Sequence, residues 1–194
     1  MRVEGHPLEP HTFVVANHTS WLDILILGGF TGTAFVSKSE VQRTALIGWL
    51  ADQNRTLYID RAERGDAHRQ VQRVADALAH PQPIAVFPEG TTGDGRHLLP
   101  FRSTLLEAVA PPPRGAQVRP VAIDYGDHAD VVGWHSGEAG LANVKRVLGH
   151  RGTMDVIVRL LHPLPPSSDR KALARHARQV IAAALSSVRE PTGL

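Results

Sequence analysis

His18 and Asp23 are the residues whose types and spacing best fit acid–base chemistry in this chain. They belong to the segment Asn-His-Thr-Ser-Trp-Leu-Asp at residues 17–23, which follows a β-branched run at residues 12–16. If a strand ends at residue 16, His18 lies on a loop and Asp23 lies in the first turn of the next segment. The carboxylate then holds one imidazole nitrogen while the other nitrogen faces a substrate, which is the arrangement of a general base.

The same segment has a purely structural interpretation. Ser20 and Asp23 fit the S-x-x-D capping pattern, and an apolar run at residues 24–27 follows them. A capped helix requires no chemistry at positions 18 and 23. The choice between the two interpretations therefore depends on the rest of the chain.

A glycine-rich loop follows the strand that we predict at residues 84–87. Its sequence, Pro-Glu-Gly-Thr-Thr-Gly-Asp-Gly at residues 88–95, has Glu89 near its start. The backbone N–H groups of such a loop can face an anion or a developing oxyanion, and Glu89 can accept a hydrogen bond from a substrate hydroxyl. The glycine spacing fits neither a dinucleotide fingerprint nor a nucleotide P-loop. An ordinary turn is the alternative.

Two further blocks lie at or near predicted strands. Arg61 comes after the strand predicted at residues 56–60, where a guanidinium can fork onto a phosphate or a carboxylate. A surface ion pair with a nearby carboxylate is the alternative. The strand predicted at residues 118–125 contains Pro120, which favours an edge position or an irregularity in the sheet.

The elements that must position these residues alternate along the chain. The periodicity predicts strands at residues 12–16, 34–36, 56–60, 84–87, 118–125 and 155–161. It predicts helices at residues 41–52, 66–79, 101–110 and 169–188, the last one capped by Ser168. This alternation predicts an α/β fold with a largely parallel or mixed central sheet flanked by helices, in which sites gather at the carboxyl ends of strands.

Length and composition limit the classes of protein. The chain of 194 residues, 42% of them apolar, is predicted to form a single domain over residues 1–194. Without cysteine it has no disulfide or thiolate zinc site, and its eleven histidines lack the spacing of a zinc pair, so we expect no metal. A net charge of +2 and 5% aromatic residues do not favour nucleic acid as a partner. No apolar run approaches the roughly 20 residues of a spanning helix.

Four blocks in register resemble the glycerolipid acyltransferase family, typified by bacterial 1-acylglycerol-3-phosphate acyltransferase. His18 and Asp23 match the family's H-x-x-x-x-D box. Leu-Tyr-Ile-Asp-Arg at residues 57–61 matches the second block, and Phe-Pro-Glu-Gly-Thr at residues 87–91 matches the third. The strand with Pro120 matches the fourth, and the likeness covers residues 3–165.

The resemblance implies an acyltransferase-like fold and the transfer of a fatty acyl group from an acyl thioester to the hydroxyl of a lysolipid. It implies that His18 removes the hydroxyl proton and that Asp23 orients the imidazole. The acceptor's polar head would contact Arg61, Glu89, Gly90, Thr91 and Lys38. The donor would be acyl-CoA or an acyl carrier protein, with no cofactor, and the first expected acceptor is 1-acylglycerol-3-phosphate, which gives phosphatidate.

Two departures from the family pattern affect these expectations. Thr92 stands where many members carry arginine, and a zwitterionic acceptor such as a lyso-ornithine lipid tolerates that change better than a phosphate does. Family members usually carry an N-terminal membrane-anchoring segment, whereas the H-x-x-x-x-D box here begins at residue 18, so either the start is truncated or the chain attaches to the membrane in another way. We therefore expect a peripheral protein on the cytoplasmic face of the inner membrane, with the helix predicted at residues 41–52 as a candidate for lipid contact.

Two hypotheses from other functional classes stay open at this point. One is a metal-assisted phosphoesterase with His18, Asp23 and Glu89 as ligands, whose activity chelators would abolish. The other is a catalytically silent lipid-binding module, which has no need of a paired base.

Overall fold

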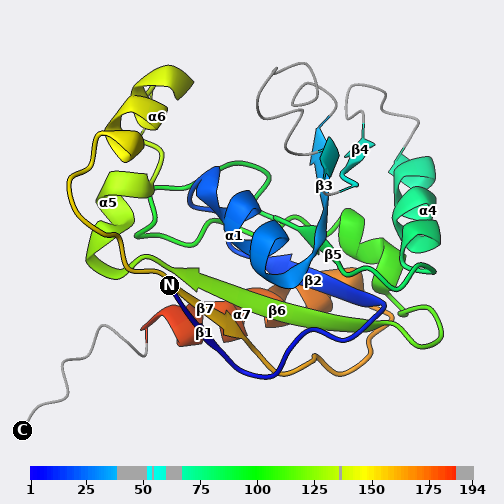
Figure 1. Cartoon of the computed structure of the whole chain (residues 1–194). Coiled ribbons are helices and arrows are strands. Elements are labelled where there is room, and N and C mark those ends of the chain that lie inside the picture. The colour runs from blue at the N-terminus through cyan, green and yellow to red at the C-terminus, as the bar shows by residue number, and fades with distance from the viewer. Residues whose placement is uncertain (39–51, 54, 60–66, 136, 187–194) are drawn as a thin grey trace, which may run out of the picture.

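The computed structural model describes residues 1–38, 52–53, 55–59, 67–135 and 137–186, and these form a seven-stranded sheet with helices on both faces (Figure 1). The strand order is β1-β7-β6-β2-β5-β3-β4. The strands are β1 (Arg2–Glu4), β2 (Thr12–Ala16), β3 (Ala34–Lys38), β4 (Leu57–Ile59), β5 (Ile84–Val86), β6 (Gln117–Asp124) and β7 (Ile157–Leu160).

Five of the six neighbouring strand pairs are parallel, and only β6 and β7 are antiparallel. The predicted fold class, α/β with a largely parallel or mixed sheet, is therefore confirmed. All six predicted strands are present. The prediction missed β1, a three-residue edge strand that forms only because β7, near the other end of the chain, pairs with it.

Helices cover the two faces of the sheet with separate hydrophobic clusters. One cluster joins α4 (Ala67–Ala77), the 3-10 helix η1 (Leu105–Val109) and α7 (Arg170–Ser186). The other joins α1 (Leu22–Thr31) and α5 (Ala129–Val132), and α6 (Gly140–Leu148) extends from this side. In β2, Phe13 belongs to the first cluster and Val14 to the second, because successive side chains of a strand point to opposite faces.

The predicted helices agree with the structure only in part. The helices expected at residues 66–79 and 169–188 are confirmed as α4 and α7, but Asp169, not Ser168, caps α7 by accepting hydrogen bonds from the backbone N–H groups of Lys171 and Ala172. The helix expected at residues 101–110 is wrong except for η1. Residues 101–103 are not helical and contact the glycine-rich loop instead, since the Arg102 N–H donates to the Pro88 carbonyl at 2.9 Å. The helix expected at residues 41–52 lies almost wholly outside the described residues.

Pro120 was expected at an edge position or at an irregularity in the sheet, and the first alternative is wrong because Pro120 lies in a central strand. β6 has β2 on one side and β7 on the other, and the β7 register begins at Val121, directly after the proline. Pairing with β7 thus starts beyond the residue that lacks an N–H donor. The buried guanidinium of Arg119 occupies this place and donates to the backbone carbonyls of His6, Pro7, Leu160 and Leu161.

Candidate active site

The loops that follow β2 and β5 meet at the carboxyl end of the sheet. The two strands are parallel neighbours, with Val14 opposite Ala85, so the segments that leave them lie side by side. His18 is two residues beyond β2, and Glu89 is three residues beyond β5. This is the position in which α/β sheets place their sites.

His18 and Asp23 form the pair that their spacing predicts. The imidazole Nδ1 of His18 is 2.9 Å from Oδ2 of Asp23, and the Asp23 side chain is fully buried. The same oxygen accepts hydrogen bonds from the backbone N–H groups of Thr19 at 2.7 Å and Ser20 at 2.9 Å. The capping interpretation and the catalytic one therefore describe the same carboxylate, which holds the backbone before α1 and the imidazole together.

Tyr125 completes the coordination of this carboxylate, and the sequence analysis missed it. Its hydroxyl donates to Oδ1 of Asp23 at 2.6 Å, and both residues are buried. Burial and the nearby Asp23 charge raise the pKa of Tyr125 well above its ordinary value, so the hydroxyl remains a proton donor. The available signal was its place directly after β6, the parallel neighbour of β2.

The second nitrogen of the imidazole is available for chemistry. The ring stacks on Phe87 with a centroid separation of 4.0 Å and an interplanar angle of 15°, and the side chain is 15% exposed. Among the described residues, Nε2 has no hydrogen-bond partner. A proton on Nδ1, held by Asp23, leaves a lone pair on Nε2 that can accept a proton from a substrate hydroxyl.

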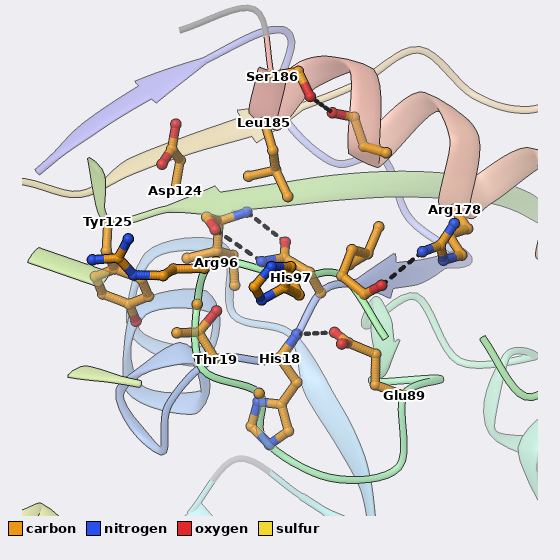
Figure 2. Close-up of a pocket in the computed structure, with 16 residues that line it drawn as sticks. His18, Thr19, Glu89, Arg96, His97, Asp124, Tyr125, Arg178, Leu185 and Ser186 are labelled. Atoms are coloured by element: carbon orange, nitrogen blue, oxygen red, sulfur yellow. Dashed lines mark hydrogen bonds between the residues drawn. The ribbon is translucent and has the colours of Figure 1, made fainter. Parts of the chain in front are cut away.

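Glu89 contacts the backbone of His18, not its ring. Its Oε1 accepts the His18 N–H at 2.7 Å (Figure 2), and its Oε2 accepts the Leu99 N–H at 2.9 Å. The residue is only 4% exposed, and burial raises its pKa despite these two hydrogen bonds. The carboxylate that the sequence suggested for acceptor binding thus links the loop after β2 to residues beyond the glycine-rich loop.

Asn17 fixes the point at which the chain leaves β2. Its side-chain N–H donates to the Ile123 carbonyl at 2.9 Å, and its side-chain oxygen accepts the Ile123 N–H at 2.8 Å. The regular pairing of β2 with β6 ends at Ala16. The amide side chain therefore continues the ladder by one residue and sets the direction in which His18 projects.

The glycine-rich loop uses at least two of its amides within the fold. The Gly90 N–H donates to the Phe87 carbonyl at 3.0 Å, and the Gly93 N–H donates to the His18 carbonyl at 2.8 Å. These two amides are therefore engaged and do not face an oxyanion. Gly95, with a φ of +76°, lies so close to Thr19 that an added Cβ would be 2.8 Å from its methyl carbon. The loop holds the backbone around His18 in place.

A hollow of about 300 Å³ lies on the other side of the His18 backbone. Arg96, His97, Arg178 and Leu185 lie around it, whereas the imidazole of His18 points away from these side chains (Figure 2). Arg178 is committed to the carbonyls of Leu98 and Leu99. His18 thus lines the hollow, but its imidazole ring is directed away from the other labelled side chains around it.

Of the remaining predicted site residues, the structure describes some and not others. Gly90 and Thr91 follow Glu89 in the loop, with Thr91 exposed. Lys38 is the last residue of β3, and its side chain, like the whole of Arg61, lies outside what the structure describes. Within the described ranges, no three histidine or carboxylate groups come together as metal ligands, and no helix is long and apolar enough to cross a bilayer.

Known proteins resemble this chain in sequence and in fold. A family model described as Acyltransferase matches residues 2–124. The lyso-ornithine lipid O-acyltransferase of Pseudomonas aeruginosa is 38% identical over 99% of this chain and 74% of that protein. The 1-acyl-sn-glycerol-3-phosphate acyltransferase of Neisseria gonorrhoeae is 32% identical over 63% of this chain and 49% of that protein.

A solved structure shares the fold. The crystal structure of the 1-acyl-sn-glycerophosphate acyltransferase from Thermotoga maritima matches 100% of this chain and 73% of that chain, with a TM-score of 0.69 and 22% sequence identity. The sheet with its flanking helices is therefore an arrangement already seen in a solved structure.

Proposed function

Because the chain belongs to the Acyltransferase family and is a lysolipid acyltransferase, we propose that it esterifies the hydroxyl of a lyso-ornithine lipid with a fatty acyl group from an acyl thioester. The choice of this acceptor rests on the similarity to a lyso-ornithine lipid O-acyltransferase along 99% of the chain. The likeness to a 1-acylglycerol-3-phosphate enzyme extends over 63%.

This proposal puts the alternative of the sequence analysis ahead of its first choice, 1-acylglycerol-3-phosphate. Thr92, in place of the arginine that many family members carry after Glu-Gly-Thr, supports the change, because a zwitterionic acceptor needs one cation less than a phosphate. Family membership also displaces the phosphoesterase and the silent lipid-binding module.

The geometry around His18 supports a direct transfer. As the acceptor oxygen attacks the thioester carbonyl, its proton passes to Nε2 of His18, and Asp23 stabilises the imidazolium through Nδ1. Collapse of the tetrahedral intermediate breaks the C–S bond, and the thiolate takes the proton back from the imidazolium. The products are an ester and a free thiol, and no covalent enzyme intermediate is needed.

The other predicted roles stay part of the proposal. Arg61 and Lys38 are proposed to meet the acceptor's polar head, with Gly90 and Thr91 beside it. Glu89 is proposed to act through the His18 backbone, because both of its oxygens accept backbone N–H groups. The donor is proposed to be acyl-CoA or an acyl carrier protein, without a cofactor or metal, and the enzyme to work at the membrane surface.

Thiol release with a panel of lysolipids tests the acceptor. The full chain is given one acyl thioester and, in parallel, lyso-ornithine lipid, 1-acylglycerol-3-phosphate or no acceptor. We expect the highest kcat/KM with lyso-ornithine lipid and an equimolar diacylated product. A higher kcat/KM with 1-acylglycerol-3-phosphate would contradict the proposed acceptor, and acceptor-independent thiol release would contradict transfer.

A further inference from the structure

Large exposed apolar side chains gather on two helices. Of five such residues in the described part of the chain, four lie on α1 or α6: Leu25, Phe30, Leu141 and Leu148. Phe30 is 55% exposed, and Leu141 and Leu148 are 67% and 72% exposed. The start of α1 is linked to α6 by the hydrogen bond from the Trp21 indole N–H to Asn143, and exposed apolar side chains on linked helices can form a place of interaction. These four residues are called the apolar face below.

The outward side of α6 is a regular stripe. Leu141, Lys145 and Leu148 have the spacing i, i+4 and i+7, which places them within roughly 60° around the helix axis. All three are exposed, while Asn143 and Val147 are buried on the inward side. Two leucines thus stand where a helix that faces only water would carry polar residues.

The position of α6 does not depend on those leucines. Arg146 donates to the Gly133 carbonyl at 2.8 Å and pairs with Glu138 at 2.6 Å. Asn143 accepts the indole N–H of Trp21, directly before α1, at 3.2 Å. These polar contacts attach α6 to the body of the protein and leave the apolar stripe free for a partner.

The exposed charge on these two helices is positive. The only ionisable residue of α1 is Asp23, which is fully buried. α6 has no acidic residue, and its Lys145 is exposed between two leucines. Apolar side chains combined with basic ones complement a lipid surface that contains anionic headgroups.

The apolar face lies on the side of the sheet that carries the base. Phe87, which stacks on the His18 imidazole, packs against the same buried cluster as Leu22 and Ile26 of α1. α7 belongs to the opposite face, as Figure 1 shows. A lipid that approaches along α1 and α6 therefore reaches the base without passing around the sheet.

We propose that the apolar face docks on the surface of a bilayer that contains anionic lipid. The proposal rests on the proposed function, because the lysolipid acceptor is a bilayer component. Leu141, Leu148 and Phe30 enter the boundary between headgroups and acyl chains, and Lys145 reaches the lipid phosphates. The contact thus involves α1 and α6, which differ in residues from the segment 41–52 that the sequence analysis named as a candidate for lipid contact.

Vesicle sedimentation of the full chain, without donor or acceptor, tests the docking directly. For vesicles of phosphatidylcholine and phosphatidylglycerol, the double substitution Leu141→Ser and Leu148→Ser should weaken binding on the order of tenfold. Lys145→Glu should weaken it by about fivefold, an effect that high salt removes. Lys171→Glu, the matched control at an exposed lysine of α7, should change it by less than about twofold.

Phe30→Ser examines α1 separately and should weaken binding by about fivefold. Thermal unfolding of each variant shows that the fold is kept, as the exposure of these side chains leads us to expect. Unchanged vesicle binding by the folded double variant would overturn the proposal. A dimer that the double substitution dissociates without altering vesicle binding would also overturn it, because the apolar face would then be covered by a second copy.

Transfer assays separate this proposal from the proposed function. The double variant should lose more activity on lyso-ornithine lipid embedded in vesicles than on the same lipid dispersed in detergent. If the wild type transfers to neither form while its vesicle binding still depends on the apolar face, the proposed function fails and the docking stands. If the wild type transfers and the double variant loses equally on both forms, the docking fails alone.

Discussion

Two buried carboxylates contact the same histidine in different ways. Asp23 binds the His18 side chain at Nδ1, and three further donors, from Thr19, Ser20 and Tyr125, complete its coordination. Glu89 binds the His18 main chain at the N–H group and uses its other oxygen for Leu99.

The two carboxylates are therefore expected to have different roles, one in proton transfer and one in positioning the histidine. A carboxylate on the imidazole affects which nitrogen carries the proton and how the imidazolium is stabilised. A carboxylate on the backbone affects chiefly where the imidazole is held. Both residues lie in motifs that look equally catalytic in the sequence, so substitutions at each should have effects of different size.

His18→Ala should have the largest effect, because it removes the group on which both carboxylates act. Turnover is expected to fall about 100- to 10,000-fold, the usual contribution of a general base. Rates of thiol release at saturating donor and acceptor measure this loss. Thermal unfolding should show a folded variant, and near-normal turnover by such a variant would rule out His18 as the base.

Asp23→Asn should have the next largest effect, a decrease in kcat on the order of 100- to 1,000-fold. The amide has no charge to stabilise the imidazolium, and its NH2 group cannot accept the Nδ1 proton. The backbone N–H groups of Thr19 and Ser20 would also donate to a weaker acceptor, so the folded state loses some stability as well. A KM increase with unchanged kcat would instead assign Asp23 to substrate binding.

Tyr125→Phe should reduce kcat/KM by roughly 3- to 10-fold, the worth of one buried hydrogen bond. Without the phenol, the Asp23 carboxylate attracts the imidazolium proton more strongly, so the acidic limb of the pH–rate profile should move to higher pH. A purely structural tyrosine would lower stability and leave that limb in place. The pH profile of kcat/KM therefore decides between the two roles.

Glu89→Gln should have the smallest effect on turnover, less than about threefold, because an amide oxygen can still accept one of the two backbone N–H groups. A loss as large as that of Asp23→Asn would show that Glu89 meets the substrate. The comparison of the two carboxylates would then fail.

The same substitution should change how stability depends on pH. Burial raises the pKa of Glu89, so the folded chain binds this proton more tightly than the unfolded chain. The resulting stability is present in acid and is lost as pH rises from the ordinary glutamate range through the raised pKa. The unfolding free energy of Glu89→Gln, measured by urea titration, should therefore fall less between acid and neutral pH than that of the wild type.

Local patterns in the sequence were sufficient to predict that His18 and Asp23 form a hydrogen-bonded pair. His18 and Asp23 are five residues apart, so the loop and the first helical turn alone bring them together. The strands were equally accessible, because buried runs such as residues 84–86 show in composition. The geometric roles of Glu89 and Tyr125 depend on the folded sheet, since their partners lie about 70 and 100 residues away along the chain.

The errors in the predicted fold also arise from contacts between residues far apart in the sequence. β1 is too short to show a period and exists because β7 pairs with it. Pro120 favours an edge by its own chemistry, yet Arg119 supplies donors at that point and permits a central position. α6 begins at Gly140 amid further glycines, and the sequence analysis did not predict it.

Asn17 has an entropic consequence for the reaction. Its two hydrogen bonds to Ile123 tie the residue before His18 to the sheet, while Asp23 and Phe87 restrain the ring. The imidazole consequently loses its rotational and positional freedom when the chain folds and not at each turnover. If His18 is the base, as proposed, that part of the activation entropy is removed before any substrate arrives.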